Sequence, residues 1–184
     1  MAHRWHKFGD CVAAGFRGRN SIWVAPWTST LDLQRTTSQQ VNTRLNLQLL
    51  SGATIEHIIV SSFDDMLAGN TLGNALTGGQ GDDTISGGLG DDVYIFSAAP
   101  IAESDLVNEL NGQGRDTLSF TTLASNLTLN LGITTPQVVH QIRTLKLNSM
   151  VEFENAAGGT GNDILSGNNR NNVLVGNEGD DQLL

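Results

Sequence analysis

The chain has 184 residues, of which 21 are glycine and 3 are proline, and its formal net charge is −9. Glycine at this level without proline excludes collagen and an ordinary disordered linker, and no run of about 18 apolar residues is present to span a membrane. Residues 45–184 carry a net charge of −13, which disfavours binding to nucleic acid and favours the recruitment of cations.

The first 44 residues differ from the rest of the chain. They hold six of the ten basic side chains and two of the nineteen acidic ones, and they contain all three tryptophans. Their apolar residues show no clear period. We therefore treat residues 1–44 as an N-terminal segment of unknown structure.

Alternating leucines predict two strands. Leucine alternates with other residues over 45–49 and again over 127–131. A period of two indicates a half-buried β-strand. Each of these strands precedes a block of short repeats.

A nine-residue repeat forms these blocks. Residues 60–95 divide into VSSFDDMLA, GNTLGNALT, GGQGDDTIS and GGLGDDVYI, and residues 158–184 divide into GGTGNDILS, GNNRNNVLV and GNEGDDQLL. The sixth position of every unit is Asp or Asn: Asp65, Asn74, Asp83, Asp92, Asp163, Asn172 and Asp181. The eighth position is leucine, isoleucine or tyrosine throughout. Seven units in one register predict a repeat architecture.

The phase of the repeat is lost between the two blocks. One degenerate unit, NGQGRDTLS, places Asp116 at its sixth position, and residues 97–110 and 133–148 are irregular, as in loops or short helices. Residues 54–70 and 152–168 align at a constant offset of 98, so we infer a duplication whose second copy carries about 16 extra residues after its leucine strand. This divides the chain into an N-terminal segment (1–44), a first repeat block with its leading strand (45–96), a spacer (97–148) and a second repeat block (149–184).

Each repeat unit supplies half of a coil. Its glycines allow a tight turn, and the three residues after the turn can form a short strand with the eighth position buried. Two units then close one coil, so the turns of units n and n+2 stack on the same side. Calcium takes about six to eight oxygen ligands, and each stacked turn, rich in carbonyls and carrying one carboxylate, can supply half of them.

The pattern G-G-x-G-x-D-x-U-x is typical of calcium-binding repeats. Through GGQGDDTIS, GGLGDDVYI and GGTGNDILS, the chain resembles the RTX, or hemolysin-type, calcium-binding nonapeptide repeat family over roughly residues 52–96 and 150–184. The resemblance implies an all-β fold, namely a parallel β-roll (a right-handed β-solenoid), with Ca²⁺ bound in the turns.

The resemblance also implies three ligand sets. In the family, one turn gives the carbonyls of positions two and four, the turn two units later gives those of positions one and three, and both give their sixth side chain. The first set joins Ser61, Phe63 and Asp65 to Gly78, Gln80 and Asp83. The second joins Asn70, Leu72 and Asn74 to Gly87, Leu89 and Asp92. The third joins Gly159, Gly161 and Asp163 to Gly176, Glu178 and Asp181.

Other acidic residues are expected to bind calcium less tightly or not at all. Two weaker pairs are Glu56 with Asn74 and Glu154 with Asn172, because a neutral amide attracts a dication less than a carboxylate does. The fifth-position carboxylates are expected to face solvent; they are Asp82, Asp91 and Asp180.

The resemblance implies a module that folds on binding extracellular calcium and forms part of a type I secreted bacterial protein. The expected location is therefore outside the cell, and the expected partners are calcium ions and the secretion machinery. The motifs H-E-x-x-H and G-x-S-x-G and the P-loop are absent from the sequence, and we do not expect an enzyme. Two alternatives stay open: an adhesion or surface-layer interaction module, and the C-terminal fragment of a secreted hydrolase or epimerase.

Overall fold

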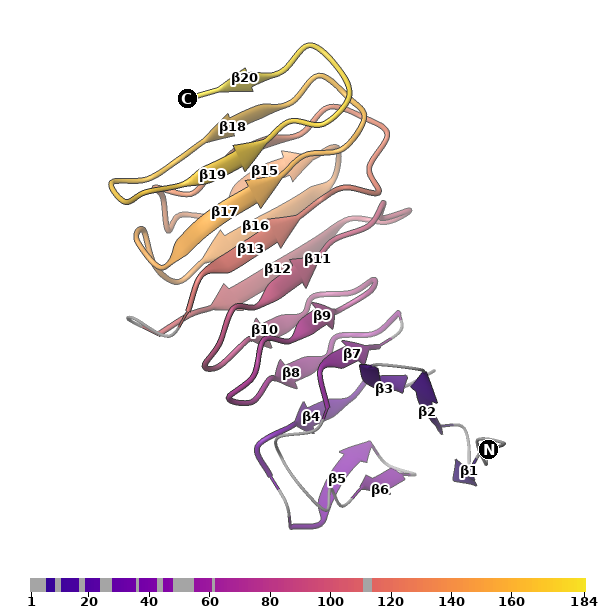
Figure 1. Ribbon diagram of the computed structural model, residues 1–184. Coiled ribbons are helices and arrows are strands. Elements are labelled where there is room, and N and C mark those ends of the chain that lie inside the picture. The colour runs from indigo at the N-terminus through magenta and orange to yellow at the C-terminus, as the bar shows by residue number, and fades with distance from the viewer. Residues whose placement is uncertain are drawn as a thin grey trace.

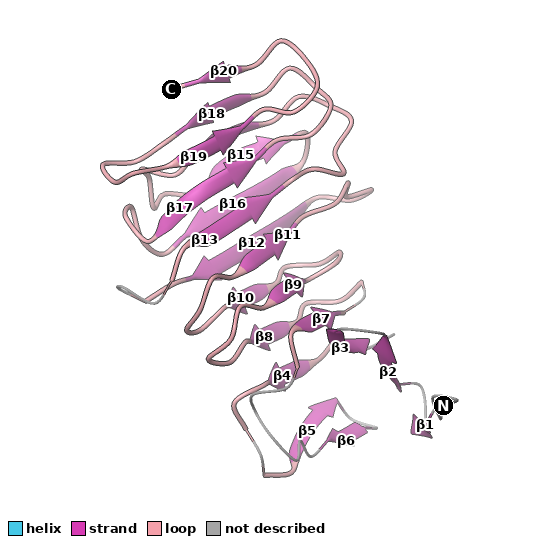
Figure 2. Cartoon of the chain, viewed as in Figure 1, coloured by secondary structure: helices cyan, strands magenta, loops and turns pink. Residues whose placement is uncertain are grey.

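The computed structural model describes residues 6–8, 11–16, 19–23, 28–35, 37–42, 45–47, 55–60, 62–110 and 114–184. Within these ranges every regular element is a β-strand, and no helix is present (Figures 1 and 2). From residue 57 onwards the repeat strands alternate between two layers, so the chain coils about a common axis (Figure 1). The prediction of an all-β fold with parallel sheets is confirmed.

One layer is a nine-stranded sheet in the order β1-β2-β3-β7-β9-β11-β13-β17-β19. Its first three strands are antiparallel, and all later pairings are parallel. The strands are β1 (His6–Phe8), β2 (Cys11–Phe16), β3 (Arg19–Trp23), β7 (His57–Ile59), β9 (Ala75–Thr77), β11 (Val93–Ile95), β13 (Asp116–Ser119), β17 (Phe153–Ala157) and β19 (Val173–Val175).

The remaining strands form three smaller sheets. The six-stranded sheet has the order β15-β16-β12-β10-β8-β4, the three-stranded sheet the order β14-β18-β20, and β5 pairs with β6 alone. These strands are β4 (Thr30–Asp32), β5 (Gln39–Asn42), β6 (Leu45–Leu47), β8 (Met66–Ala68), β10 (Thr84–Ser86), β12 (Glu103–Asn108), β14 (Thr128–Asn130), β15 (Gln137–His140), β16 (Arg143–Leu147), β18 (Ile164–Ser166) and β20 (Gln182–Leu183).

The strands of successive coils pair in the register that the repeat predicts. Leu67 of β8 lies opposite Ile85 of β10, and Ile58 of β7 lies opposite Leu76 of β9. Both pairs are 18 residues apart, the length of two repeat units. Turns of units n and n+2 therefore stack on the same side of the molecule.

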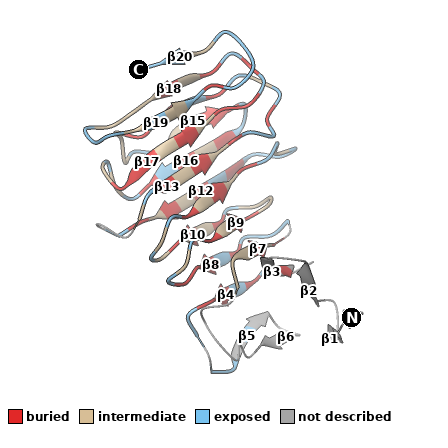
Figure 3. Cartoon of the chain, viewed as in Figure 1, coloured by how far each residue is buried: buried red, intermediate tan, exposed pale blue. Residues whose placement is uncertain are grey.

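The core lies between the layers and contains the eighth side chain of most units. Buried residues alternate with more exposed ones along the strands (Figure 3). The buried eighth-position side chains are Ile58, Leu67, Leu76, Ile85, Tyr94, Leu118, Ala156 and Leu165. Each large aliphatic one contributes roughly 1.5–3 kcal/mol when it leaves water. Leu183 is 49 % exposed, because β20 is the outermost strand of its sheet.

The spacer contains strands where loops or short helices were expected. In β12, alternate side chains are buried, with Glu103, Asp105 and Val107 facing inward. Because two of its inward positions hold acidic residues, this strand does not show the alternation of apolar and polar residues that predicts a half-buried strand. Strand β13, from the degenerate unit, pairs with both β11 and β17, so the nine-stranded sheet runs through both repeat blocks without a break.

The duplication extends further back than the sequence indicated. Leu31 of β4 pairs with Leu67, and Leu129 of β14 pairs with Leu165, so β4 is the counterpart of β14 at the offset of 98. The β5–β6 and β15–β16 hairpins correspond at the same offset. Matching the leucines of 45–49 with those of 127–131 was therefore wrong, and the inferred extra residues of the second copy disappear. The alternation of leucines had matched β6 with β14, but these two strands pair with different neighbours, β6 with β5 and β14 with β18.

Candidate metal centres in the stacked turns

The sixth residue of each unit comes directly before a strand, at one of two edges of the solenoid. The turns that lead into β8 and β10 carry Asp65 and Asp83, and Asp105, the third residue of β12, continues this row. Turns at the opposite edge lead into β9 and β11 and carry Asn74 and Asp92, and Asp116, the first residue of β13, continues that row. The fold thus gathers the acidic residues into two rows, which alternate along the sequence.

Hydrogen bonds bring the predicted partners of each site together. The backbone N–H of Asp65 donates to Oδ1 of Asp83 over 2.8 Å. The N–H of Asn74 donates to Oδ1 of Asp92 over 2.7 Å, and that of Asp163 donates to Oδ1 of Asp181 over 2.8 Å. All three predicted pairs of sixth positions are therefore neighbours.

The second carboxylate oxygen has no such partner in the first two sites. Oδ2 of Asp65, of Asp83 and of Asp92 is buried without a hydrogen bond. Burial raises the pKa of the Asp83 carboxyl to about 8 and those of Asp65 and Asp92 to about 7. A buried anionic oxygen without a donor is costly, and a calcium ion supplies the positive charge that offsets this cost. These residues therefore fit calcium.

Glycine at the first position leaves room for this carboxylate. A Cβ on Gly78 would overlap Oδ2 of Asp83, and a Cβ on Gly87 would overlap Oδ2 of Asp92. Gly90, at the fourth position, has a φ of 98° and stacks on the backbone of Leu72 in the coil below. The glycine pattern therefore reflects the packing of carboxylates and turns against each other.

The other predicted ligands lie in turns that stack as expected. A Cβ on Gly81 would overlap the backbone of Phe63, and a Cβ on Gly179 would overlap the carbonyl oxygen of Gly161. The N–H of Leu89 donates to the carbonyl of Asn70 over 3.0 Å. Ser61 lies outside the described residues. The assignment of individual carbonyls as ligands stays a prediction.

In the turns whose sixth residue is asparagine, the side-chain amide makes hydrogen bonds to backbone groups. Oδ1 of Asn74 accepts the N–H of Asn70 over 2.7 Å, and its Nδ2 donates to the carbonyl of Ile55 over 3.1 Å. Asn172 makes the corresponding bonds to Asn168 and Phe153. The amide supplies both a donor and an acceptor, so these turns have less need of a cation. Weaker calcium binding by the pairs Glu56–Asn74 and Glu154–Asn172 stays a prediction.

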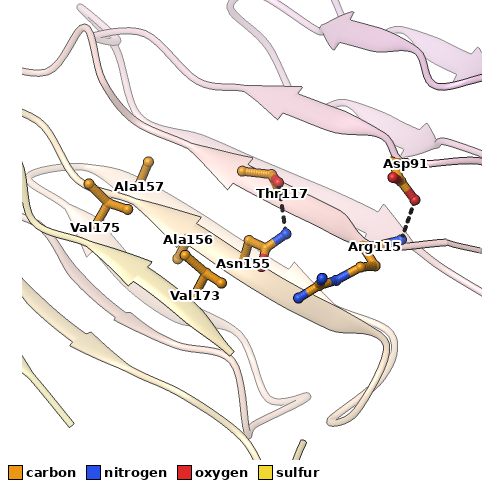
Figure 4. Close-up of a pocket in the computed structure, with 8 residues that line it drawn as sticks. All are labelled: Asp91, Arg115, Thr117, Asn155, Ala156, Ala157, Val173 and Val175. Atoms are coloured by element: carbon orange, nitrogen blue, oxygen red, sulfur yellow. Dashed lines mark hydrogen bonds between the residues drawn. The ribbon is translucent and has the colours of Figure 1, made fainter. Parts of the chain in front are cut away.

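Fifth-position carboxylates are exposed, as expected, yet they also join successive coils. Oδ1 of Asp82 accepts the N–H of Ser104 over 2.7 Å, and Oδ1 of Asp91 accepts that of Arg115 over 3.0 Å. Asp91 and Arg115 border an open hollow of about 430 Å³ on the outer face of the nine-stranded sheet, across β13, β17 and β19 (Figure 4). Thr117 accepts a hydrogen bond from Asn155 there, over 3.2 Å.

The acidic row that contains Asp65, Asp83 and Asp105 is followed, on the next strand of the sheet, by a buried arginine of the spacer. Arg143 of β16 is 2 % exposed and forms ion pairs with Glu103 and Asp105. It also donates to the carbonyl of Ser97 over 2.8 Å, and its guanidinium lies 5.3 Å from the centre of the Phe96 ring. No local pattern indicates this cluster, because Arg143 lies 38 and 40 residues after its two acidic partners and none of the three belongs to an intact repeat. Their proximity follows from the pairing of β12 with β16.

Comparison with known proteins bears on the repeats directly. The family model of the RTX calcium-binding nonapeptide repeat matches four copies, at residues 68–97 and 157–184. No curated protein and no solved structure matched the chain. Within the described residues, no helix is long and apolar enough to cross a membrane.

Proposed function

Because residues 68–97 and 157–184 carry RTX calcium-binding nonapeptide repeats, we propose that this chain is a module whose folding is driven by calcium. The observation that carries the proposal is the set of buried Oδ2 atoms on Asp65, Asp83 and Asp92, which have no hydrogen-bond donor. Calcium bound beside them neutralises their charge. The free energy of metal binding then becomes free energy of folding.

The distribution of charge supports calcium dependence. Residues 45–184 hold seventeen acidic and four basic side chains, and the acidic rows bring many of these acids close together in the folded state. Without cations this repulsion opposes the compact form. Calcium at millimolar concentration removes it.

We further propose that the module belongs to a secreted bacterial protein of the type I export class and works outside the cell. Scarce calcium in the cytoplasm would leave the acidic chain unfolded and exportable, and abundant calcium outside would fold it. Its role is then structural and not catalytic. The support for this setting is the repeat family and the excess of acidic residues.

An adhesion role is the second candidate, and exposed apolar side chains on the outer face of the nine-stranded sheet favour it. The hollow there is lined by Val173 and Val175, which are 49 % and 43 % exposed, beside Arg115. Calcium-driven folding does not depend on this surface, so the two functions are separable by mutation of the hollow.

Circular dichroism during a calcium titration tests the proposal. In chelator the chain should give the spectrum of a largely disordered protein, and millimolar calcium should produce β structure. Magnesium at the same concentration is the control, because it prefers six ligands at shorter distances and should be less effective. A fully folded spectrum in strong chelator would overturn the proposal.

A further inference from the structure

A third acidic group lies where the repeats meet the spacer. Carboxylate oxygens of Asp92, Glu109 and Asp116 all lie within 4.8 Å of one another, and all three residues are buried. Asp92 belongs to the last intact repeat of the first block and Asp116 to the degenerate unit. Glu109 belongs to neither, since it directly follows β12.

The register of the sheet explains how Glu109 reaches this position. Ser86 of β10 lies opposite Asn108 of β12, so Glu109 occupies the place that Gly87 has one coil earlier. In the preceding turn of this edge, Gly87 at the first position leaves Asp92 at the sixth position as the inward acid. Here the first position carries a second carboxylate, and it turns inward: Glu109 is 2 % exposed.

Two oxygens of the group have no hydrogen-bond partner. Oδ2 of Asp92 and Oε2 of Glu109 are buried without one. Their other oxygens are held by backbone donors: Asn74 N–H to Asp92 over 2.7 Å, and Gly87 N–H to Glu109 over 3.3 Å. Each of these two carboxylates is thus held through one oxygen, and its other oxygen has no hydrogen-bond donor.

We infer that Asp92, Glu109 and Asp116 bind one calcium ion that joins the first repeat block to the spacer. The inference rests on the proposed calcium binding of the repeats and adds a ligand that the nonapeptide pattern does not contain. Three carboxylates in one small group are a hard, oxygen-only donor set, which suits calcium. Burial and the charges of Asp116 and Asp92 raise the pKa of Glu109 to about 8, a cost that a bound cation would relieve.

The chain carries its own optical probe for this site. Tyr94 is its only tyrosine, and the Tyr94 hydroxyl oxygen accepts the same Gly87 N–H as Glu109, over 2.7 Å. Terbium ions bind in calcium sites and emit when a nearby tyrosine is excited. Tyr94→Phe removes the tyrosine that transfers excitation energy to terbium, so that only the emission sensitised by the three tryptophans is left.

The experiment compares Glu109→Gln with Asp91→Asn in the full chain, by calcium calorimetry and by terbium emission. Asp91→Asn removes the same charge next to Asp92, from an exposed side chain. Glu109→Gln should lose the Tyr94-dependent emission and weaken one calcium site at least about tenfold, because affinity rises with the number of charged ligands. Asp91→Asn should resemble the wild type.

Glu109→Asp keeps the charge and should recover part of the emission, which separates loss of a ligand from loss of the fold. Equal calcium affinity and stoichiometry in Glu109→Gln and Asp91→Asn would overturn the assignment of Glu109 while leaving calcium binding by the repeats intact. Absence of any calcium uptake by the wild type would overturn the proposed function itself.

Discussion

Replacement of Arg143 by methionine should be among the most damaging single changes in the spacer. Arg143 is 2 % exposed and neutralises two acids, Glu103 and Asp105, which are 3 % and 2 % exposed. Methionine retains much of the apolar stem beside Phe96 but leaves both acids without their cation. Removing one partner of a buried ion pair typically costs about 3–5 kcal/mol. For a domain of this size that corresponds to a fall in Tm of roughly 6–20 °C.

The loss should depend on pH and on calcium. Burial raises the pKa of Glu103 to about 7, and Arg143 opposes this rise. Without the arginine that pKa rises further, so the variant should lose more stability at pH 8 than at pH 5, where Glu103 takes up a proton. High calcium should restore part of the loss, because Glu103, Asp105 and the free Oδ2 of Asp83 then form an acidic group that attracts a dication.

Thermal unfolding at pH 5 and pH 8, each at a calcium concentration just sufficient for folding and at a saturating one, measures both effects. Lys146→Met is the matched control, because Lys146 is an exposed cation on the same strand, β16. It should change the Tm by little. A Tm for Arg143→Met within the range of the Lys146→Met control would refute the view that Arg143 acts as a built-in counter-ion.

Three further predictions follow from the turns. In calcium-free buffer, the β structure seen by circular dichroism should decrease as pH rises from about 4 to about 8, because the pKa of Asp83 is raised from 3.8 to about 8, so that the folded chain binds more protons than the unfolded chain over that window; more β structure at pH 8 than at pH 5 would contradict this. Gly78→Ala should raise the calcium midpoint of folding, since its Cβ would displace the Asp83 carboxylate; Gly132→Ala, whose Cβ would have 3.2 Å to its nearest neighbour, should not. Asp83→Asn should raise the midpoint more than Asp82→Asn does, and equal effects would mean that the assigned register is wrong.

Much of the repeat region was predictable, because its signal is local. The nine-residue period places the eighth side chains in the core and the sixth side chains in the turns, and both placements follow from a strand of three residues after each turn. Asp65 and Asp83 could be paired from spacing alone, since two units make one coil. The exposure of Asp82 and Asp91 followed from the same register.

The spacer was not predictable for a physical reason. Inward positions of β12 hold Glu103 and Asp105, which local patterns assign to solvent, and the buried Arg143 of β16 offsets their charge. That compensation lies far away in sequence and is set by strand pairing. Glu109 escaped notice in the same way, because its equivalence to Gly87 appears only in the register between β10 and β12.

The most direct test is a crystal structure grown in calcium, with anomalous scattering used to locate the ions. Peaks should appear beside the sixth-position carboxylates, between Asp65 and Asp83 and between Asp163 and Asp181. The fifth-position carboxylates, Asp82 and Asp180, should have none. Peaks at the fifth positions, or an ordered roll with no calcium in these turns, would contradict the account.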